Sequence, residues 1–209
     1  MWPLLSTLGP RILIPGVFVG QRISGLTDPA VISQTIAFSF LFISFAVVLF
    51  SETPWLSLIP GIAALAYWTM IKDEKNLEVY RYADWGLTTP LMLLAILLAN
   101  GASFIHILST LGLDFIMIGS GYYGAIEKDE TKKQTAFALG CLVFLPILYT
   151  LCQMKKARYA VYLTVSLWIL YPILWYLDQE GFITKESSTV SYSILDVIAK
   201  VGLVNVLHL

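Results

Sequence analysis

The sequence predicts an all-α membrane protein, a bundle of seven transmembrane helices preceded by a short interfacial segment. Hydrophobic residues make up 57% of its 209 residues and charged residues 13%, whereas a soluble domain carries about a quarter charged residues. Seven apolar runs come close to about 20 residues, the length that crosses ~30 Å of hydrocarbon. The links between these runs are short, so neighbouring helices must run antiparallel in one bundle.

The apolar runs begin and end at residues that typically bound helices. Asp28 and Pro29 form a helix start, because aspartate caps a helix and proline suits its first turn. Asn100 and Gly101 separate the third run from the fourth. The predicted spans cover residues 29–51, 54–71, 77–98, 103–123, 133–153, 157–177 and 188–207.

Residues 1–27 differ from the spans. They are apolar, but three prolines interrupt them, and Arg11 and Arg22 add charge. A signal peptide would begin with a basic region and end in a small-residue cleavage site, and neither is evident. We expect this segment to lie at the membrane interface and cap the domain formed by residues 28–209, rather than to add an eighth span.

We expect a multi-pass protein of a cell or host-derived membrane. Its composition also limits its partners. The net charge of −1 argues against nucleic acid as a partner. Cys141 and Cys152 lie in one apolar run without a disulfide pattern, so we expect them to be packing residues, and we expect no metal site. Lys155, Lys156 and Arg158 would place their link in the cytoplasm. Because the opposite side carries more basic residues in total, the orientation stays open.

Few of the 27 charged residues (13 basic and 14 acidic) lie well inside a span. Lys200 follows Asp196 by four positions, so both lie on one face of the last span. A lone ammonium near a bilayer centre costs roughly 3 kcal/mol or more, so it usually has a partner and a function. Together with Arg81 and Asp84 the pair sums to zero charge, the form in which ions survive in low dielectric. Such a cluster could also simply fix helix register in a transporter.

Four strings of residues favour a more specific interpretation. The third span reads RYADWGLTTPL from Arg81, the sixth WILYPILW from Trp168 and the seventh DVIAKVG from Asp196, while the fourth contains LDFIMIGSG from Leu113. In this order the strings closely resemble the microbial (type 1) rhodopsins, from about Asp28 to the last residue. The very short loops and the N-terminal segment are also similar to the viral rhodopsins of giant algal viruses, in general shape rather than in a motif.

The resemblance implies a role for each charged residue. Lys200 would hold all-trans retinal covalently as a protonated Schiff base, and a desolvated lysine is a usable nucleophile towards an aldehyde. Asp84 resembles the primary counter-ion and proton acceptor, and Asp196 the second counter-ion. Arg81 resembles the arginine that stabilises both and directs the proton outward, with Thr88 one turn deeper than Asp84 on the proton pathway.

The resemblance also implies a flat retinal pocket. Trp168, Tyr171 and Trp175 form one stripe on the sixth span, which in other proteins is more often plain core. Thr89 and Asp114 resemble a hydrogen-bonded pair between two helices, in which burial would keep the aspartate neutral. The family's pocket positions correspond here to Trp85, Thr89, Met92, Asp114, Phe137, Phe144, Trp168, Tyr171 and Trp175. An apolar Met92 at a colour-tuning position favours green over blue absorption.

Two regions depart from the family's outward proton pumps. Seven residues past Thr88, where such pumps keep an acidic internal proton donor, this chain has Ala95. Reprotonation would then come slowly from cytoplasmic water, and His106 is a conceivable substitute, although a packed or lipid-facing histidine explains it more simply. Glu180 stands where a release-group acid occurs in the family, and Glu186 lies near the second. Both could equally be solvated loop residues.

Three functions follow, none of them enzymatic. A light-driven outward proton pump with a slow photocycle fits Asp84 as proton acceptor. A light-gated channel is the second, supported only weakly by Thr35 and Ser39 on one face of the first span and opposed by Val201 after the lysine. The third is a photosensor that signals to a partner. Lipid and small ions, protons above all, are the expected partners, and a homo-trimer or pentamer is expected from the family.

Overall fold

The helices of this protein form where the apolar runs were predicted. The structure, a computed structural model, describes residues 27–208, so most of the predicted interfacial segment lies outside the described residues. The elements are α2 (Pro29–Leu49), η1 (Pro54–Ser57), α3 (Leu58–Lys72), η2 (Glu74–Asn76), α4 (Leu77–Ala99), α5 (Phe104–Ile126), α6 (Glu130–Cys152), α7 (Arg158–Trp168), α8 (Leu170–Gln179) and α9 (Lys185–His208). Seven helical segments in the described residues are long and apolar enough to cross a membrane, which confirms the seven-helix bundle.

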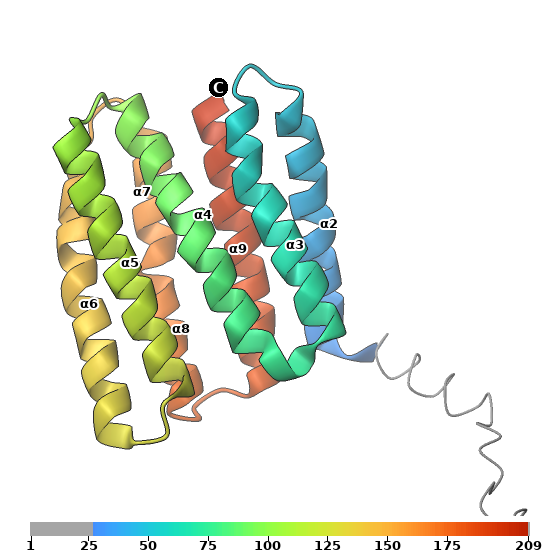
Figure 1. The fold of residues 1–209 in the computed structure, drawn as a ribbon. Coiled ribbons are helices and arrows are strands. Elements are labelled where there is room, and N and C mark those ends of the chain that lie inside the picture. Colours follow the sequence, from blue (N-terminus) through green and yellow to red (C-terminus); the bar gives the residue numbers. More distant parts are fainter. Residues whose placement is uncertain (1–26, 209) are drawn as a thin grey trace, which may run out of the picture.

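The helices stand side by side and close into a ring (Figure 1). Each helix packs on the next along the chain, and α9 returns to pack on α2, α3 and α4. The α4–α5 turn and the α6–α7 link lie at one end of the bundle, here called the Asn100 end, where Lys156 N donates to Asn100 Oδ1 at 2.7 Å. The α3–α4, α5–α6 and α8–α9 links lie at the opposite end, here called the Glu78 end (Figure 1).

Local signals explain where the helices start and stop. Asp28 caps α2 by accepting a hydrogen bond from Ala30 N, with Pro29 in the first turn. After α4, Gly101 adopts φ 72°, a left-handed conformation that favours glycine. The fourth, fifth and seventh spans run about one turn past their predicted bounds, to Ile126, from Glu130 and from Lys185, because polar residues can continue a helix outside the apolar layer.

The sixth span is divided, which the apolar pattern did not indicate. Helix α7 ends at Trp168 and α8 begins at Leu170, with a turn at Ile169. Pro172 has no N–H and cannot donate to the carbonyl of Trp168, so the helical hydrogen-bond ladder is interrupted there. The break lies between two of the three aromatic residues of the predicted stripe.

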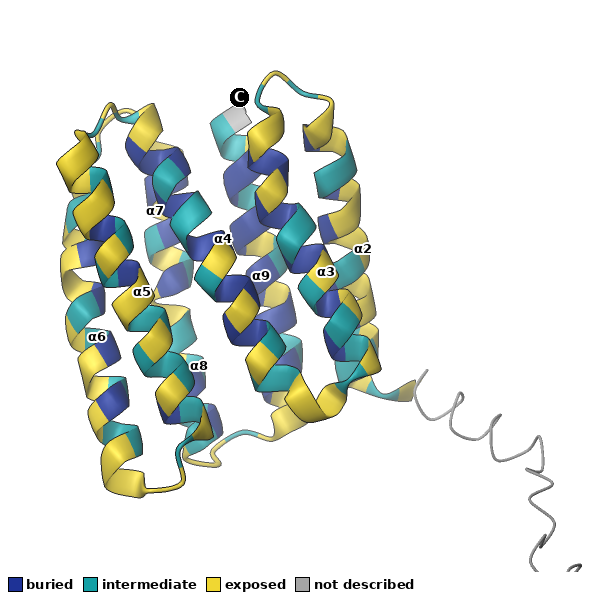
Figure 2. Ribbon diagram, in the orientation of Figure 1, coloured by how far each residue is buried: buried dark blue, intermediate teal, exposed yellow. Residues whose placement is uncertain are grey.

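The interior of the bundle differs between its two halves. Towards the Asn100 end, α4, α6, α7 and α9 enclose an apolar cluster that includes Ile96, Ile147 and Leu203, each 0% exposed. The buried charged side chains lie from the middle of the bundle towards the Glu78 end, among them Arg81, Asp84, Asp178 and Asp196. The outward-facing surface of the helices is exposed (Figure 2) and rich in large hydrophobic residues, as contact with lipid requires.

Candidate functional site

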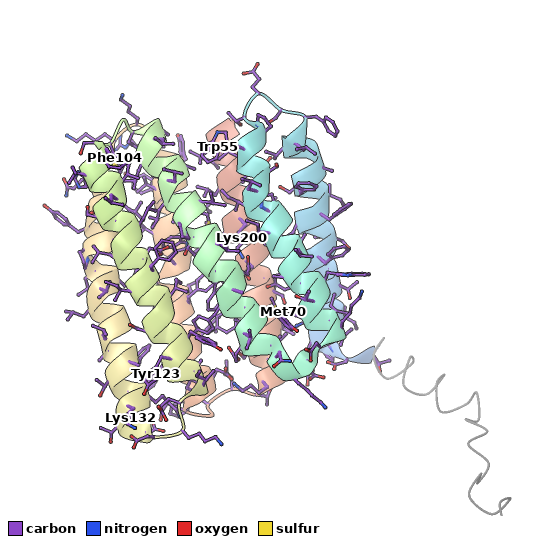
Figure 3. The ribbon with its side chains drawn as sticks, viewed as in Figure 1. Trp55, Met70, Phe104, Tyr123, Lys132 and Lys200 are labelled. Carbon is purple, nitrogen blue, oxygen red and sulfur yellow. The ribbon has the colours of Figure 1, made fainter. Side chains whose placement is uncertain are left out.

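A buried ammonium lies at the centre of the bundle. Lys200 projects from α9 about halfway along the helices (Figure 3) and is 1% exposed. Its Nζ forms an ion pair with Asp84 Oδ2 of α4 and lies 3.4 Å from Asp196 Oδ1, one turn earlier on α9. Both carboxylates are 1% exposed. One cation therefore faces two buried anions. This arrangement tolerates a permanent positive charge at Nζ, and it also allows the ammonium proton to move to one of the carboxylates.

The two carboxylates have different hydrogen-bond partners. Asp196 accepts from Tyr67 at 2.9 Å, from Trp85 at 3.2 Å and from Tyr171 at 2.8 Å. Asp84 accepts from Lys200 and, at 3.3 Å, from the hydroxyl of Thr88. Because donated hydrogen bonds stabilise the charged form of a carboxylate, Asp196 is held as an anion more firmly than Asp84. Asp84 is accordingly the better placed of the two to accept a proton.

Arg81 does not join the neutral cluster of four charges that the sequence suggested. Its guanidinium donates to both carboxylate oxygens of Glu78, at 3.0 and 3.1 Å, and lies over the ring of Tyr192 at 4.4 Å from the centroid. No ion pair within 4.0 Å joins Arg81 to Asp84 or Asp196 in the described structure. Glu78 is three positions before Arg81 on the same helix, so it reaches the guanidinium without distorting α4.

An apolar cavity borders Lys200 and is lined by residues of α4, α5, α6, α7, α8 and α9. Its walls combine predicted and unpredicted residues, namely Tyr82, Trp85, Thr89, Met92, Met117, Ile118, Gly121, Phe137, Gly140, Cys141, Phe144, Trp168, Tyr171, Pro172, Trp175, Tyr192, Asp196 and Ala199. Phe137 and Trp175 stack at 4.7 Å between centroids with an interplanar angle of 5°. The two rings are therefore in contact with each other and form part of one wall, in a cavity whose lining is largely apolar and aromatic and suits an apolar ligand.

Asp114 is the one predicted pocket residue that does not line the cavity. It lies behind Thr89, whose hydroxyl donates to Asp114 Oδ2 at 2.8 Å. The carboxyl is 0% exposed, and its Oδ1 has no hydrogen-bond partner among the described residues. The Thr89–Asp114 pair thus joins α4 to α5 directly behind the cavity wall.

The predicted outer acids lie apart from this site. Glu180 is exposed and accepts a hydrogen bond from Gln134 of α6, and Glu186 is exposed at the start of α9. Thr88, by contrast, is buried and also donates to the backbone carbonyl of Asp84 at 2.8 Å. The structure therefore brings together Lys200, Asp84, Asp196 and Thr88, and leaves both glutamates at the surface.

Comparison with known proteins places this geometry in a family. The model of the family described as bacteriorhodopsin-like proteins matches residues 30–209. The chain belongs to this family. Archaerhodopsin-2 of Halobacterium sp. (strain aus-2) is 33% identical over 172 residues, which are 69% of this chain and 66% of that protein. Bacteriorhodopsin of Halobacterium salinarum is 34% identical over 173 residues, 70% of this chain and again 66% of the relative.

Solved structures agree with this assignment. The light-driven proton pump of Coccomyxa subellipsoidea superposes on this bacteriorhodopsin-like protein with a TM-score of 0.78 and 26% identity, covering 87% of this chain and 96% of that one. The chain thus spans just under two thirds of its curated relatives but nearly the whole of a solved one. Bacteriorhodopsin-like proteins are membrane transporters and photoreceptors rather than enzymes.

Several contacts of this bacteriorhodopsin-like site were missed in the sequence. Tyr67 on α3 and Tyr192 on α9 reach the central charges from apolar spans, and no local pattern marks them, because their contacts depend on how each helix is rotated. Asp178 could have been found. It lies three positions after Trp175, in register with the aromatic stripe, and it is buried at 7% exposure.

Proposed function

We propose that this protein binds all-trans retinal covalently at Lys200 and is a light-driven outward proton pump with a slow photocycle. The observation that carries the proposal is the position of Lys200, which lines an aromatic cavity and whose Nζ pairs with two buried carboxylates. The Glu78 end of the bundle would face the outside, and the Asn100 end, with Lys155, Lys156 and Arg158 beside it, would face the cytoplasm.

The residues around the cavity fit retinal. The walls are mainly apolar and rich in aromatic rings, among them the stacked pair of Phe137 and Trp175, and such surroundings suit an apolar polyene. A Cβ built on Gly121, which lines the cavity, would lie 3.1 Å from the ring of Tyr82, so a larger residue would crowd this wall. When bound, retinal supplies the absorption of light and the change of shape that drives charge movement. The protein supplies the amine, the counter-charges and the dry surroundings.

The residues around Lys200 favour proton transfer in one direction. Lys200 Nζ contacts Asp84, and this contact provides the path by which the amine proton moves to the carboxylate. Thr88 donates to Asp84 and holds its carboxylate in position, while Asp196 keeps its charge through three donated hydrogen bonds. The proton therefore moves from Lys200 to Asp84 on α4. Arg81 lies on the same helix, about one turn nearer the Glu78 end.

Return of a proton to Lys200 would be slow. Ala95 is 4% exposed within the apolar cluster between Lys200 and the Asn100 end, and it has no proton to give. His106 is exposed at the start of α5, where its backbone N–H donates to the cap residue Ser103. Because the residue is exposed, it lies outside the buried path to Lys200. We infer that the proton is taken from cytoplasmic water.

The alternatives have less support. Thr35 and Ser39, the hydroxyls that could have lined a channel, are exposed and donate to carbonyls of their own helix α2. A photosensor that signals to a partner remains the second candidate, because a slow return of the proton would prolong a signalling state. Assembly as a trimer or pentamer and membership of the viral rhodopsins remain predictions, as does capping of the bundle by residues 1–27.

The test uses the protein loaded with all-trans retinal in vesicles of known orientation. Illumination should change the external pH in the direction set by that orientation, and a protonophore should abolish the change. A light-dependent current that reverses with the applied ion gradient would show a channel instead. A light-induced change in visible absorption without any ion transport would favour the photosensor function. Lys200→Ala should give a colourless protein, and borohydride should trap an adduct on the peptide that contains Lys200.

A further inference from the structure

Four charged side chains form a second cluster nearer the Glu78 end than Lys200. Arg81 is 4% exposed and pairs with Glu78 at 3.0 Å. Lys185 at the start of α9 pairs with Asp178 of α8 at 2.8 Å, and its Nζ also lies 4.0 Å from Glu78. Lys185 thus connects the two carboxylates. The cluster sums to zero charge, and it joins three helices on the outward side of the site.

Two atoms next to this cluster are buried without a described partner. Asp178 Oδ1 accepts no hydrogen bond in the described structure, although the residue is only 7% exposed. Ser188 Oγ also has no described hydrogen-bond partner, and Ser188 is 1% exposed. A buried polar atom without a partner costs free energy, so such atoms usually contact ordered water. Asp178 Oδ1 and Ser188 Oγ are therefore candidate sites for ordered water next to the cluster.

The cluster also continues the line of the proton path. Glu78, Arg81 and Asp84 follow one another at three-residue intervals on α4, so Arg81 neighbours both carboxylates on the helix surface, and Glu78 is about 9 Å further along the axis than Asp84. The side chain of Glu78 is 24% exposed, whereas that of Asp84 is 0% exposed. Glu78 therefore contacts both the buried arginine and the solvent.

We propose that Glu78, paired with Arg81 and supported by Lys185 and Asp178, is the proton-release group of this protein, in place of Glu180 and Glu186. The inference rests on the proposed pump function. The proton that Asp84 receives from Lys200 passes by way of bound water to the carboxylate of Glu78, which becomes neutral and loosens its ion pair with Arg81. Glu78 then gives the proton to external water and recovers its charge. One proton enters the cluster and one leaves, so no other reactant is needed.

Asp178 has a positioning role in this scheme. Its Oδ2 accepts a hydrogen bond from Lys185, which also lies beside Glu78, and its Oδ1 has no described partner and is available to hold a water molecule near the cluster. Glu180 cannot replace it, because its carboxylate is exposed and its described hydrogen bond is to Gln134. Glu186 is exposed as well.

The proposal is tested by timing proton release from the retinal-loaded protein with a pH-sensitive dye in the external medium. Absorption records the transfer from Lys200 to Asp84 in the same sample. Glu78→Gln should delay the dye signal by about tenfold or more, since the loss of a proton-transfer group costs at least that much. The first transfer should keep its rate. Asp178→Asn should delay release less, and Glu180→Gln and Glu186→Gln should match the wild type.

Glu78→Asp separates proton transfer from a structural role. It keeps a carboxyl, but its side chain is shorter by one methylene and its ion pair with Arg81 is weaker, so release should be within about threefold of the wild type if the carboxyl carries the proton. An equal delay in Glu78→Asp and Glu78→Gln would mean that only the ion pair matters and would overturn the proposal. So would normal release in Glu78→Gln, or a delay confined to Glu180→Gln. Absence of any outward release by the wild type would refute the pump function itself, before the variants are compared.

Discussion

At the scale of single residues, hydrogen bonding distinguishes two carboxylates that face the same ammonium. Asp196 is surrounded by the hydroxyls of Tyr67 and Tyr171 and the indole N–H of Trp85, whereas Asp84 is left with Thr88 and Lys200 itself. A carboxylate that is already stabilised by donors gains less from a proton. Their roles therefore differ although their burial is the same.

Asp84→Asn should shift the absorption of the retinal-loaded protein to longer wavelength and stop proton release. The amide of the asparagine carries no negative charge to balance the cation at Lys200, and it cannot accept the proton that leaves Lys200. Visible spectra and the external dye signal measure the two effects. Glu74→Gln, which neutralises an exposed acid near the Glu78 end, is the matched control and should change neither. An unchanged colour in Asp84→Asn would mean that the counter-ion has been assigned to the wrong residue.

Thr89→Val should destabilise the folded protein by about 1 kcal/mol, because Asp114 would lose its described hydrogen bond while remaining buried. Thermal denaturation, followed through the loss of visible absorption, measures the change. Thr35→Val is the control, since that hydroxyl is exposed and bonds only the carbonyl of Val31 on its own helix. Equal stability of the two variants would show that the Thr89–Asp114 pair contributes nothing.

The central charges could be predicted from the sequence better than their surroundings. Asp196 and Lys200 share a helix face by spacing alone, and the strings on the third and seventh spans made Asp84 their natural partner. Arg81 was assigned to the same cluster, yet it binds Glu78, because a long side chain near a helix end can turn towards either side. Sequence spacing fixes the face of a helix but not the direction of a flexible side chain.

At the scale of helices, the division of the sixth span has consequences for the cavity. The turn at Ile169 separates Trp168 on α7 from Trp175 on α8, and both line the cavity. Pro172 was visible in the sequence, but Pro90 and Pro146 lie inside α4 and α6 without ending them. Whether a proline divides a helix depends on the packing around it, so the seven spans could be predicted and this break could not.

Gly124→Ala should disturb the cavity from the outside of its wall. A Cβ at Gly124 would lie 3.0 Å from the ring of Trp175, which is already stacked on Phe137 and has little room to move. We expect a shifted absorption maximum and a loss of about 1 kcal/mol in stability. Gly119→Ala on the same helix α5 is the control, because its Cβ would meet nothing within 4 Å. Similar spectra for both variants would contradict this account of the wall.

At the scale of the whole molecule, the two halves of the bundle differ in polarity. From Lys200 to the Glu78 end, charged side chains follow one another on α4, α8 and α9. From Lys200 to the Asn100 end, the described interior consists mainly of the apolar cluster around Ile96, Ile147 and Leu203, and its buried polar side chains are uncharged hydroxyls such as Thr110 and Thr164. A proton therefore meets ionisable groups on one side of the site and hydrocarbon on the other, which favours departure towards the Glu78 end.

Recovery of the dark state should depend on the pH of the medium at the Asn100 end. Without an internal donor its rate should fall about tenfold for each unit of rising pH, since the proton comes from water. Ala95→Asp should speed recovery and remove most of this dependence, and Ala95→Asn, which has no proton to give, should do neither. Flash photolysis over a range of pH measures all three. A recovery independent of pH in the wild type would indicate a donor elsewhere in the chain.

The apolar half should also act as an electrical insulator. A membrane voltage falls mainly across the least polarisable layer, and in this protein that layer is the packed hydrocarbon between Ala95 and the Asn100 end. A proton that crosses it works against most of the field, about 2.3 kcal/mol for each 100 mV. We expect voltage to change the rate of proton uptake by Lys200 strongly and the rate of proton release hardly at all. A membrane voltage that opposes outward transport would therefore slow the cycle at its slowest step.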